Sequence, residues 1–157
     1  MIAFAWNLTL ALAWVILTGS FTAANLVWGF IVAYFVLRLT HRRNPDFEAY
    51  FARVPQAARF ALFFMWDLTK SNIRVAYDVL TPTHYMRPGV IALPLDARTD
   101  AEITALANLI TVTPGALALD VSSDRRVLYI HLMYLDDEQR LREELKDLER
   151  RVLQLMR

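Results

Sequence analysis

The first 37 residues contain no Asp, Glu, Lys, Arg or His, and this absence of charge limits the fold more than any other feature. They form two apolar runs that meet at Thr18-Gly19-Ser20. About 20 apolar residues, rising roughly 1.5 Å each in a helix, cross the roughly 30 Å hydrocarbon layer. Backbone groups in lipid must pair within their own segment, so each run must be helical. The sequence therefore predicts a transmembrane helical hairpin over residues 1–40, with spans at about 2–18 and 21–39.

The charges next to this hairpin predict its orientation. Basic residues follow the second run at Arg38, Arg42 and Arg43, whereas the turn at Gly19-Ser20 is neutral. Lys and Arg near the end of a span mark its cytoplasmic side. We therefore expect a multi-pass protein of the lipid bilayer with both termini in the cytoplasm. A cleaved signal peptide is the alternative for the first run, but the preceding basic segment is missing and a second apolar run follows at once.

Residues 44–82 are the next predicted segment, an amphipathic helix. Its start is marked by Asn44-Pro45-Asp46, since Pro is favoured in the first turn of a helix. The window 60–66 is free of charge but too short to span a membrane. Charged residues recur at spacings of three, four or eight, which places them on one side: Arg59, Asp67, Lys70, Arg74 and Asp78.

A helix with basic residues and aromatics can lie in the plane of the membrane interface. We expect this one at the cytoplasmic surface or against a neighbouring membrane protein, with Phe63, Trp66 and Arg74 as candidate interface residues. The alternative is a third, partly inserted segment, because Arg59 and Lys70 could extend their charged ends toward water.

Residues 88–157 predict a small cytoplasmic α+β domain with the order βαββα. An edge strand at 90–95 precedes a helix that Thr99-Asp100-Ala101-Glu102 opens as a capping box. A hairpin follows, with strands at 116–121 and 126–135, and the last helix carries acidic residues in its first turn. Both faces of the second hairpin strand are apolar, so we expect both to be covered, one of them by a partner.

This domain contains a run of residues that resembles a known family. The run comprises Thr111, Thr113, Pro114, Gly115, Asp120, Ser122, Asp124 and His131. Together with the hydrophobic hairpin and the short cytoplasmic domain, it resembles the E subunit of the multisubunit monovalent cation/proton antiporters, called Mrp, Mnh or Pha. The resemblance covers essentially the whole chain.

The resemblance implies membership of a bacterial plasma-membrane complex that exchanges Na⁺, or another monovalent cation, for protons. The implied partners are two large antiporter-like subunits, which carry the ion paths in that family, and several small hydrophobic subunits. The chain would be an accessory subunit that contributes to assembly and stability. Its structural motif residues would be Thr113, Pro114, Gly115, Asp120, Asp124 and His131.

The residues themselves favour the same role. Ion paths need ionisable groups inside the membrane, and the hairpin has none. Asn7 and Asn25 are candidates for hydrogen bonds between helices, each worth roughly 0.6 kcal/mol on average. We therefore expect that this chain does not move ions by itself. A net charge of +1 does not indicate the basic surface that nucleic-acid binding requires. The absence of cysteine excludes disulfides and thiolate metal sites.

No catalytic, metal or cofactor site is expected. The three histidines lack the spacing of metal ligands, and residues 120–124 lack the Gly and the downstream Glu of a calcium loop, so we interpret them as a turn. Asp120, Ser122 and His131 lack the nucleophile elbow of a hydrolase. The alternatives are a membrane-anchored adaptor or sensor whose cytoplasmic domain binds a soluble partner or ligand, and a membrane-tethered enzyme.

Overall fold

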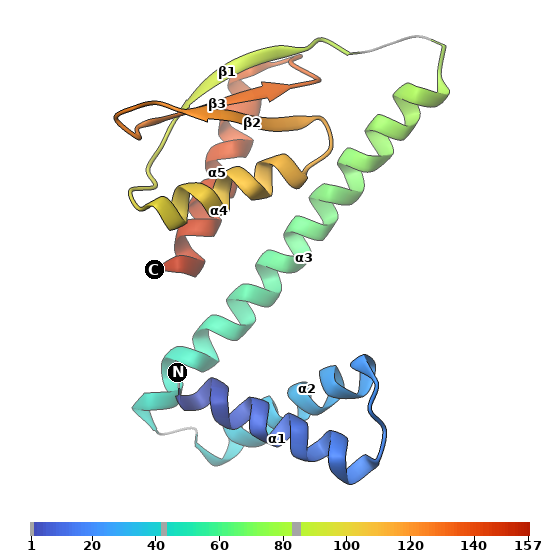
Figure 1. The fold of residues 1–157 in the computed structure, drawn as a ribbon, viewed down its shortest axis with the longest axis vertical. Coiled ribbons are helices and arrows are strands. Elements are labelled where there is room, and N and C mark those ends of the chain that lie inside the picture. The colour runs from blue at the N-terminus through green and yellow to red at the C-terminus, as the bar shows by residue number, and fades with distance from the viewer. Residues whose placement is uncertain (1, 42–43, 83–85) are drawn as a thin grey trace. The chain divides into compact units, whose positions relative to one another are not determined.

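The computed structural model describes residues 2–41, 44–82 and 86–157 (Figure 1). The chain divides into two compact units, Met1–Ala58 and Arg59–Arg157. The first unit contains helices α1 (Ile2–Thr18) and α2 (Ala23–Thr40) and the beginning of helix α3 (Pro45–Leu80). The second unit contains the rest of α3 and a small α/β domain.

Helices α1 and α2 form a hairpin that packs through small side chains. Ala11 and Ala33 are buried, and Gly29 allows the backbones to approach closely. A Cβ atom at Gly29 would lie 3.0 Å from the Ala11 carbonyl oxygen and 2.9 Å from Cδ1 of Trp14. Small residues at such contacts are typical of helices that associate in lipid, where dispersion packing replaces the hydrophobic effect.

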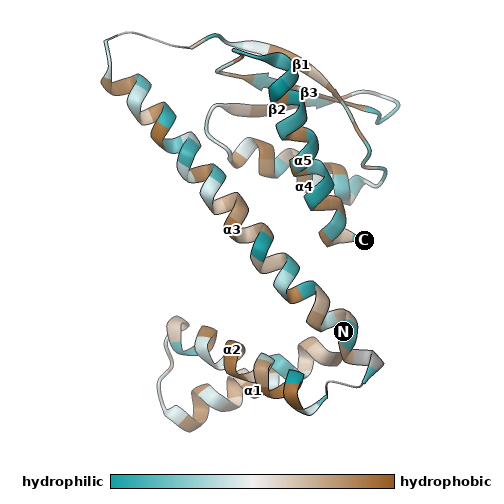
Figure 2. Ribbon diagram, turned by 180° about the vertical axis from the view of Figure 1, so that it is seen from behind, coloured by the Kyte–Doolittle hydropathy of each residue, from teal (hydrophilic) through white to brown (hydrophobic). Residues whose placement is uncertain are grey.

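The outer surface of the hairpin carries many large apolar side chains, and Figure 2 shows that α1 and α2 are built largely from hydrophobic residues. Leu17 and Phe21 are 85% and 77% exposed, whereas the polar Asn7 is fully buried. Among the described helices, α2 is the one that passes as a membrane span by length and composition, and α1 is a shorter apolar helix of 17 residues. The predicted pair of apolar helices is present, with α2 beginning at Ala23 rather than 21 because Thr22 caps it.

Helix α3 contains Pro55 in its interior. Proline has no N–H group, so the carbonyl of Phe51, four residues earlier, loses its usual helical partner. The hydroxyl of Tyr34 on α2 donates to that carbonyl at 3.3 Å. A side chain of the hairpin therefore replaces the hydrogen bond that proline removes from α3.

The α/β domain has the order β1 (Gly89–Pro94), α4 (Asp100–Val112), β2 (Ala116–Val121), β3 (Val127–Leu132) and α5 (Glu138–Met156). Its antiparallel sheet has the strand order β1-β3-β2, which confirms the predicted small sheet. Strand β3 is shorter than the predicted 126–135, because beyond Leu132 the regular antiparallel pairing gives way, within the described residues, to an isolated parallel bridge between Arg87 and Tyr134.

Helices α4 and α5 cover one face of the sheet (Figure 1). The core between them alternates along β3, where Leu128, Ile130 and Leu132 point inward. The sequence predicts that these residues share a face, but not which of the two apolar faces is buried. The complete buried cluster comprises Ile91, Leu93, Leu106, Ile110, Leu128, Ile130, Leu132, Leu148 and Val152. The period of two in β3 and the helical spacing of α4 and α5 together place these residues on facing surfaces.

A buried carboxylate of α5 holds the loop between β1 and α4. Glu149 is 1% exposed, and its Oε1 accepts the backbone N–H groups of Asp96 at 2.7 Å and Ala97 at 3.0 Å. Its Oε2 accepts a hydrogen bond from Lys146 at 2.8 Å. The loop therefore obtains its backbone hydrogen bonds from a side chain more than 50 residues away.

A second carboxylate, Glu102, completes the predicted capping box of α4 with Thr99. Its Oε2 accepts the backbone N–H groups of Arg98 at 2.8 Å and Thr99 at 3.1 Å, and Oε1 accepts Nε of Arg157 at 2.9 Å. These donors favour the charged form. They lower the pKa of Glu102 to about 2, with the Arg157 hydrogen bond as the largest cause.

Candidate interaction surfaces

The two candidate asparagines of the hairpin make different contacts. Asn25 closes the turn, because its Nδ2 donates to Oγ1 of Thr18 and to the carbonyl of Ser20, both at 2.7 Å. Its Oδ1 accepts Nε1 of Trp14 at 3.1 Å. These bonds fix the separation between the end of α1 and the beginning of α2.

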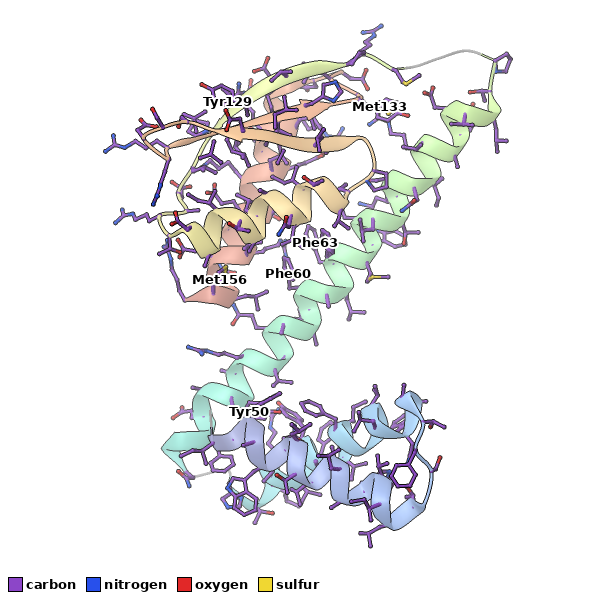
Figure 3. The ribbon with its side chains drawn as sticks, viewed as in Figure 1. Tyr50, Phe60, Phe63, Tyr129, Met133 and Met156 are labelled. Atoms are coloured by element: carbon purple, nitrogen blue, oxygen red, sulfur yellow. The ribbon has the colours of Figure 1, made fainter. Side chains whose placement is uncertain are left out.

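Asn7 forms its hydrogen bond with the first part of α3. Its Nδ2 donates to the hydroxyl of Tyr50, which Figure 3 labels, while its Oδ1 is buried and has no partner among the described residues. A buried amide oxygen without a partner is costly, most of all in an apolar environment. The hydrogen bond of Asn7 thus links α1 to α3, while the acceptor Oδ1 remains without a partner among the described residues.

Within the second unit, the side of α3 that faces the α/β domain carries polar side chains that contact this domain. Asp78 is 3% exposed, and its Oδ2 accepts the hydroxyl of Tyr134 at 3.3 Å. Arg74 lies over the Tyr134 ring, with Cζ 4.3 Å from the centroid, and pairs with Asp136 at 2.6 Å. Burial, followed by the nearby Asp78 carboxylate, raises the pKa of Tyr134 and keeps it a hydrogen-bond donor.

Aromatic side chains extend this contact along α3. Phe60, Phe63 and Phe64 pack against the core of the α/β domain, and Phe60 and Phe63 are labelled in Figure 3. The guanidinium of Arg151 lies 4.1 Å from the Phe63 ring centroid. Of the three interface candidates on α3, Phe63 and Arg74 therefore contact the chain's own domain.

Next to this contact, α3 presents an exposed apolar surface. It carries Trp66, which is 63% exposed with Lys70 beside its ring, at 5.7 Å from the centroid. Its other exposed members are Leu62, Met65, Ile73, Tyr77 and Leu80. The stripe runs over residues 62–80, about 27 Å of helix. Large exposed apolar patches mark interaction sites, so Trp66 is the candidate that lies on an open surface.

The outer face of the sheet is a second exposed apolar surface. It presents Val90, Leu117, Leu119 and Tyr129, and Figure 3 labels Tyr129 there. The register places His131 between Val90 and Leu117. An antiparallel sheet with one face in water normally alternates apolar and polar residues, so this apolar outer face is unusual for a solvated sheet.

The motif residues that precede β2 form the turn after α4. Thr113 caps the helix and donates its hydroxyl to the carbonyl of Leu109 at 3.1 Å. After Pro114, Gly115 has φ +87°, in the left-handed region that favours glycine. A Cβ atom there would lie 3.4 Å from the Tyr134 ring.

The remaining motif residues belong to the β2–β3 hairpin. Asp120 accepts the N–H of Val121, and Ser122 donates to Asp124 at 2.6 Å. That hydrogen bond, followed by the N–H of Arg126, lowers the pKa of Asp124. These side chains bond their own turn, and within the described residues no group of three or more His, Asp or Glu side chains could hold a metal ion.

Sequence reasoning missed three contributors to these contacts: Tyr50, Tyr134 and the pair of Tyr34 with Pro55. Only Pro55 carried a local signal, since a proline inside a helix always frees one carbonyl. His84, one of the three histidines of the sequence, lies outside the described residues.

A family model described as "Na+/H+ ion antiporter subunit" matches residues 7–155. The E subunit of the Na⁺/H⁺ antiporter of Alkalihalophilus pseudofirmus is 33% identical over 150 residues, 95% of this chain and 94% of that protein. The E1 subunit of the Na⁺/H⁺ antiporter of Staphylococcus haemolyticus is 39% identical over 125 residues, 80% of this chain and 78% of that protein.

Two solved structures contain similar chains. One is the Mrp complex from a Dietzia species, with 33% identity, a TM-score of 0.50, and coverage of 64% of this chain and 96% of that chain. The other is the membrane-bound sulfane sulfur reductase, an archaeal respiratory complex, with 26% identity, a TM-score of 0.51, and coverage of 86% and 84%. This chain belongs to the family of Na⁺/H⁺ antiporter E subunits. The family is one of transport proteins, which removes the membrane-tethered enzyme from the alternatives.

Proposed function

We propose that this chain is an accessory membrane subunit of a Na⁺/H⁺ antiporter complex, and that it supports assembly and stability while other subunits carry the ion path. The observation that carries this proposal is the absence of Asp, Glu, Lys, Arg and His from the first 37 residues. Ion and proton paths through a bilayer depend on such groups. The partners are the other subunits of the complex, two large antiporter-like ones and several small hydrophobic ones.

In this proposal the chain is held in the bacterial plasma membrane by the hairpin, with both termini on the cytoplasmic side. Residues 88–157 then form a cytoplasmic domain, and α3 lies at the membrane surface. The apolar stripe around Trp66 supports this placement, because it would face lipid or a neighbouring subunit rather than water.

The hydrogen bonds of Asn7 and Asn25 have a structural role in this proposal. Asn25 uses its polar atoms on the turn, and Asn7 links α1 to Tyr50 of α3. Neither residue has a charged partner within the described part of the hairpin. Each therefore contributes to the shape of the surface that neighbouring subunits recognise.

The test is a mild-detergent purification of the tagged chain from its native membrane, combined with Na⁺/H⁺ exchange in vesicles. We expect the other antiporter subunits to co-purify. Asn7→Ala should lower the amount of assembled complex, while exchange per assembled complex stays unchanged. The matched control is Thr9→Ala on the same helix, whose hydroxyl bonds only the carbonyl of Ala5.

Two outcomes would contradict the proposal. Full assembly of Asn7→Ala with loss of exchange would place this chain in the ion path. Purification of the chain alone, or with soluble companions only, would favour the membrane-anchored adaptor or sensor instead.

A further inference from the structure

A groove of about 900 Å³ opens within the second unit, between α3 and α5. The turn after α4 closes one of its ends with Pro114 and Gly115. Partly buried apolar side chains form its floor, including Phe63, Leu141 and Leu145. The α3 wall extends over residues 63–74, about 16 Å or three helical turns.

The lining of the groove is acidic, although the chain as a whole is slightly basic. Three basic residues line it, Lys70, Arg74 and Arg140, against six acidic ones. The whole chain has 17 Lys and Arg and 16 Asp and Glu. The acidic residues are Asp67, Asp136, Asp137, Glu143, Glu144 and Asp147.

Some of these acidic groups already form ion pairs, and three form none in the part of the chain that the structure describes. One of the three, Asp137, accepts the backbone N–H of Arg140 instead. Asp136 pairs with Arg74, and Glu144 with Arg140. Asp67 and Glu143 form no ion pair within the described residues. Asp67 is half-buried, and burial raises its pKa even though Lys70 acts in the opposite direction. A partly desolvated carboxylate of this kind is stabilised when a cation approaches it.

We propose that this groove receives a basic amphipathic segment of a neighbouring subunit. Its apolar side would rest on the Phe63 floor, and its Lys or Arg side chains would meet Asp67 and Glu143. This inference rests on the proposed function, since it requires neighbouring subunits. A helix laid into an apolar groove is a recurring mode of recognition, and charge complementarity sets its orientation and specificity.

The charge of the groove argues against lipid as the occupant. The cytoplasmic leaflet carries anionic headgroups that attract basic surfaces and repel acidic ones. The groove has an excess of acidic residues, so its complement is a cationic polypeptide. The apolar stripe around Trp66 adjoins the groove along α3, with Lys70 at the border, but lacks this acidic rim.

The experiment places a photo-crosslinking amino acid at Ser71, which lines the groove, in the full chain within its native membrane. The matched control position is Thr104, which is exposed on α4 and outside the groove. We expect Ser71 to form a covalent adduct with another antiporter subunit, in a peptide rich in Lys or Arg. Thr104 should give little or none.

A charge variant then tests the complementarity. Glu143→Gln should lower the Ser71 adduct several-fold, because it removes an unpaired acidic group from the rim. Gln139→Lys changes the net charge by the same amount on the same helix outside the groove, and should leave the adduct unchanged.

Adducts with a second copy of this chain, with lipid alone, or with nothing would overturn the inference, as would equal loss in both charge variants. Co-purification of the other subunits is scored in the same membranes. If they still co-purify while the Ser71 adduct is absent, the groove inference fails and the accessory role stands.

Discussion

The hairpin and the α/β domain place their polar and apolar side chains in opposite ways. In the hairpin, Leu17 and Phe21 point outward and the polar Asn7 is buried. In the α/β domain, apolar side chains fill the core and ion pairs cover helix α5. The difference fits the proposed placement of the hairpin in the membrane: in lipid nothing is gained by hiding apolar surface, whereas in water that burial drives folding.

The two regions also use buried polar groups differently. The hairpin buries an uncharged amide, while the domain buries the carboxylate of Glu149 with one cation and two backbone donors. A buried charge is tolerated only when it is paired and hydrogen-bonded. The domain can supply such partners, whereas the first 37 residues contain no cation to supply one.

The largest effect should come from a charge inside the hairpin. Ala11→Asp places a carboxylate between α1 and α2, and a charge at the centre of a membrane helix costs about 3 kcal/mol on insertion scales. We expect the protein to disappear from the membrane fraction, as measured by immunoblotting. Ala101→Asp is the control, because it adds the same charge to the exposed first turn of α4, where the helix dipole favours it. Normal membrane levels of Ala11→Asp would show that this position is not in an apolar environment.

In the α/β domain, the removal of a buried charge should lower the stability of the fold. Glu149→Ala leaves the N–H groups of Asp96 and Ala97 without their acceptor, which should lower the free energy of unfolding by about 3 kcal/mol. Urea unfolding of the full chain in detergent, with proteolysis of residues 88–157 as the readout, measures this change. Glu144→Ala removes an exposed carboxylate from the same helix and should cost less than about 1 kcal/mol, the value of a surface pair. Equal losses in the two variants would argue against the role of Glu149 as the anchor of the loop.

The smallest effect should be a pH dependence of the domain. The pKa of Glu102 is about 2 in the folded protein, below the ordinary value of 4.5, so its stabilising contribution is complete above pH 4.5 and is lost as the pH falls toward 2. Glu102→Gln should therefore destabilise the domain at about pH 6 and much less at about pH 2.5, in the same unfolding measurement. The wild type also loses stability through Asp96 and Asp147, whose pKa values are lowered by Lys146 and Arg151. Only the difference between variant and wild type reports Glu102, and a difference independent of pH would contradict this assignment.

Local pattern predicts much of this fold. The charge-free runs predict α1 and α2, the alternation along β3 groups Leu128, Ile130 and Leu132 on one face, and Thr99 with Glu102 predicts the start of α4. Each of these signals lies within a few residues of the structure that it specifies.

Contacts between distant residues were beyond prediction from one sequence. Asp78 was placed on a charged side of α3, but nothing local indicates that Tyr134, 56 positions later, would cover it. Asn7 was expected to bond across helices, but its partner is Tyr50, 43 positions later. Which side of α3 meets the domain depends on such pairs, so only the fold shows that Phe63 packs against the domain while Trp66, on the adjoining side, stays exposed.

The contact of Tyr34 with the carbonyl of Phe51 has a consequence for how substitutions combine. The hydrogen bond from the Tyr34 hydroxyl to that carbonyl replaces a missing helical bond only while residue 55 is a proline. Any other residue at position 55 would supply its own N–H. The effect of Tyr34→Phe therefore depends on the identity of a residue on another helix. Relatives that lack the proline lose this reason to keep the hydroxyl, which then serves only as the acceptor of Arg38 Nη1, 3.2 Å away, so the two positions should tend to change together.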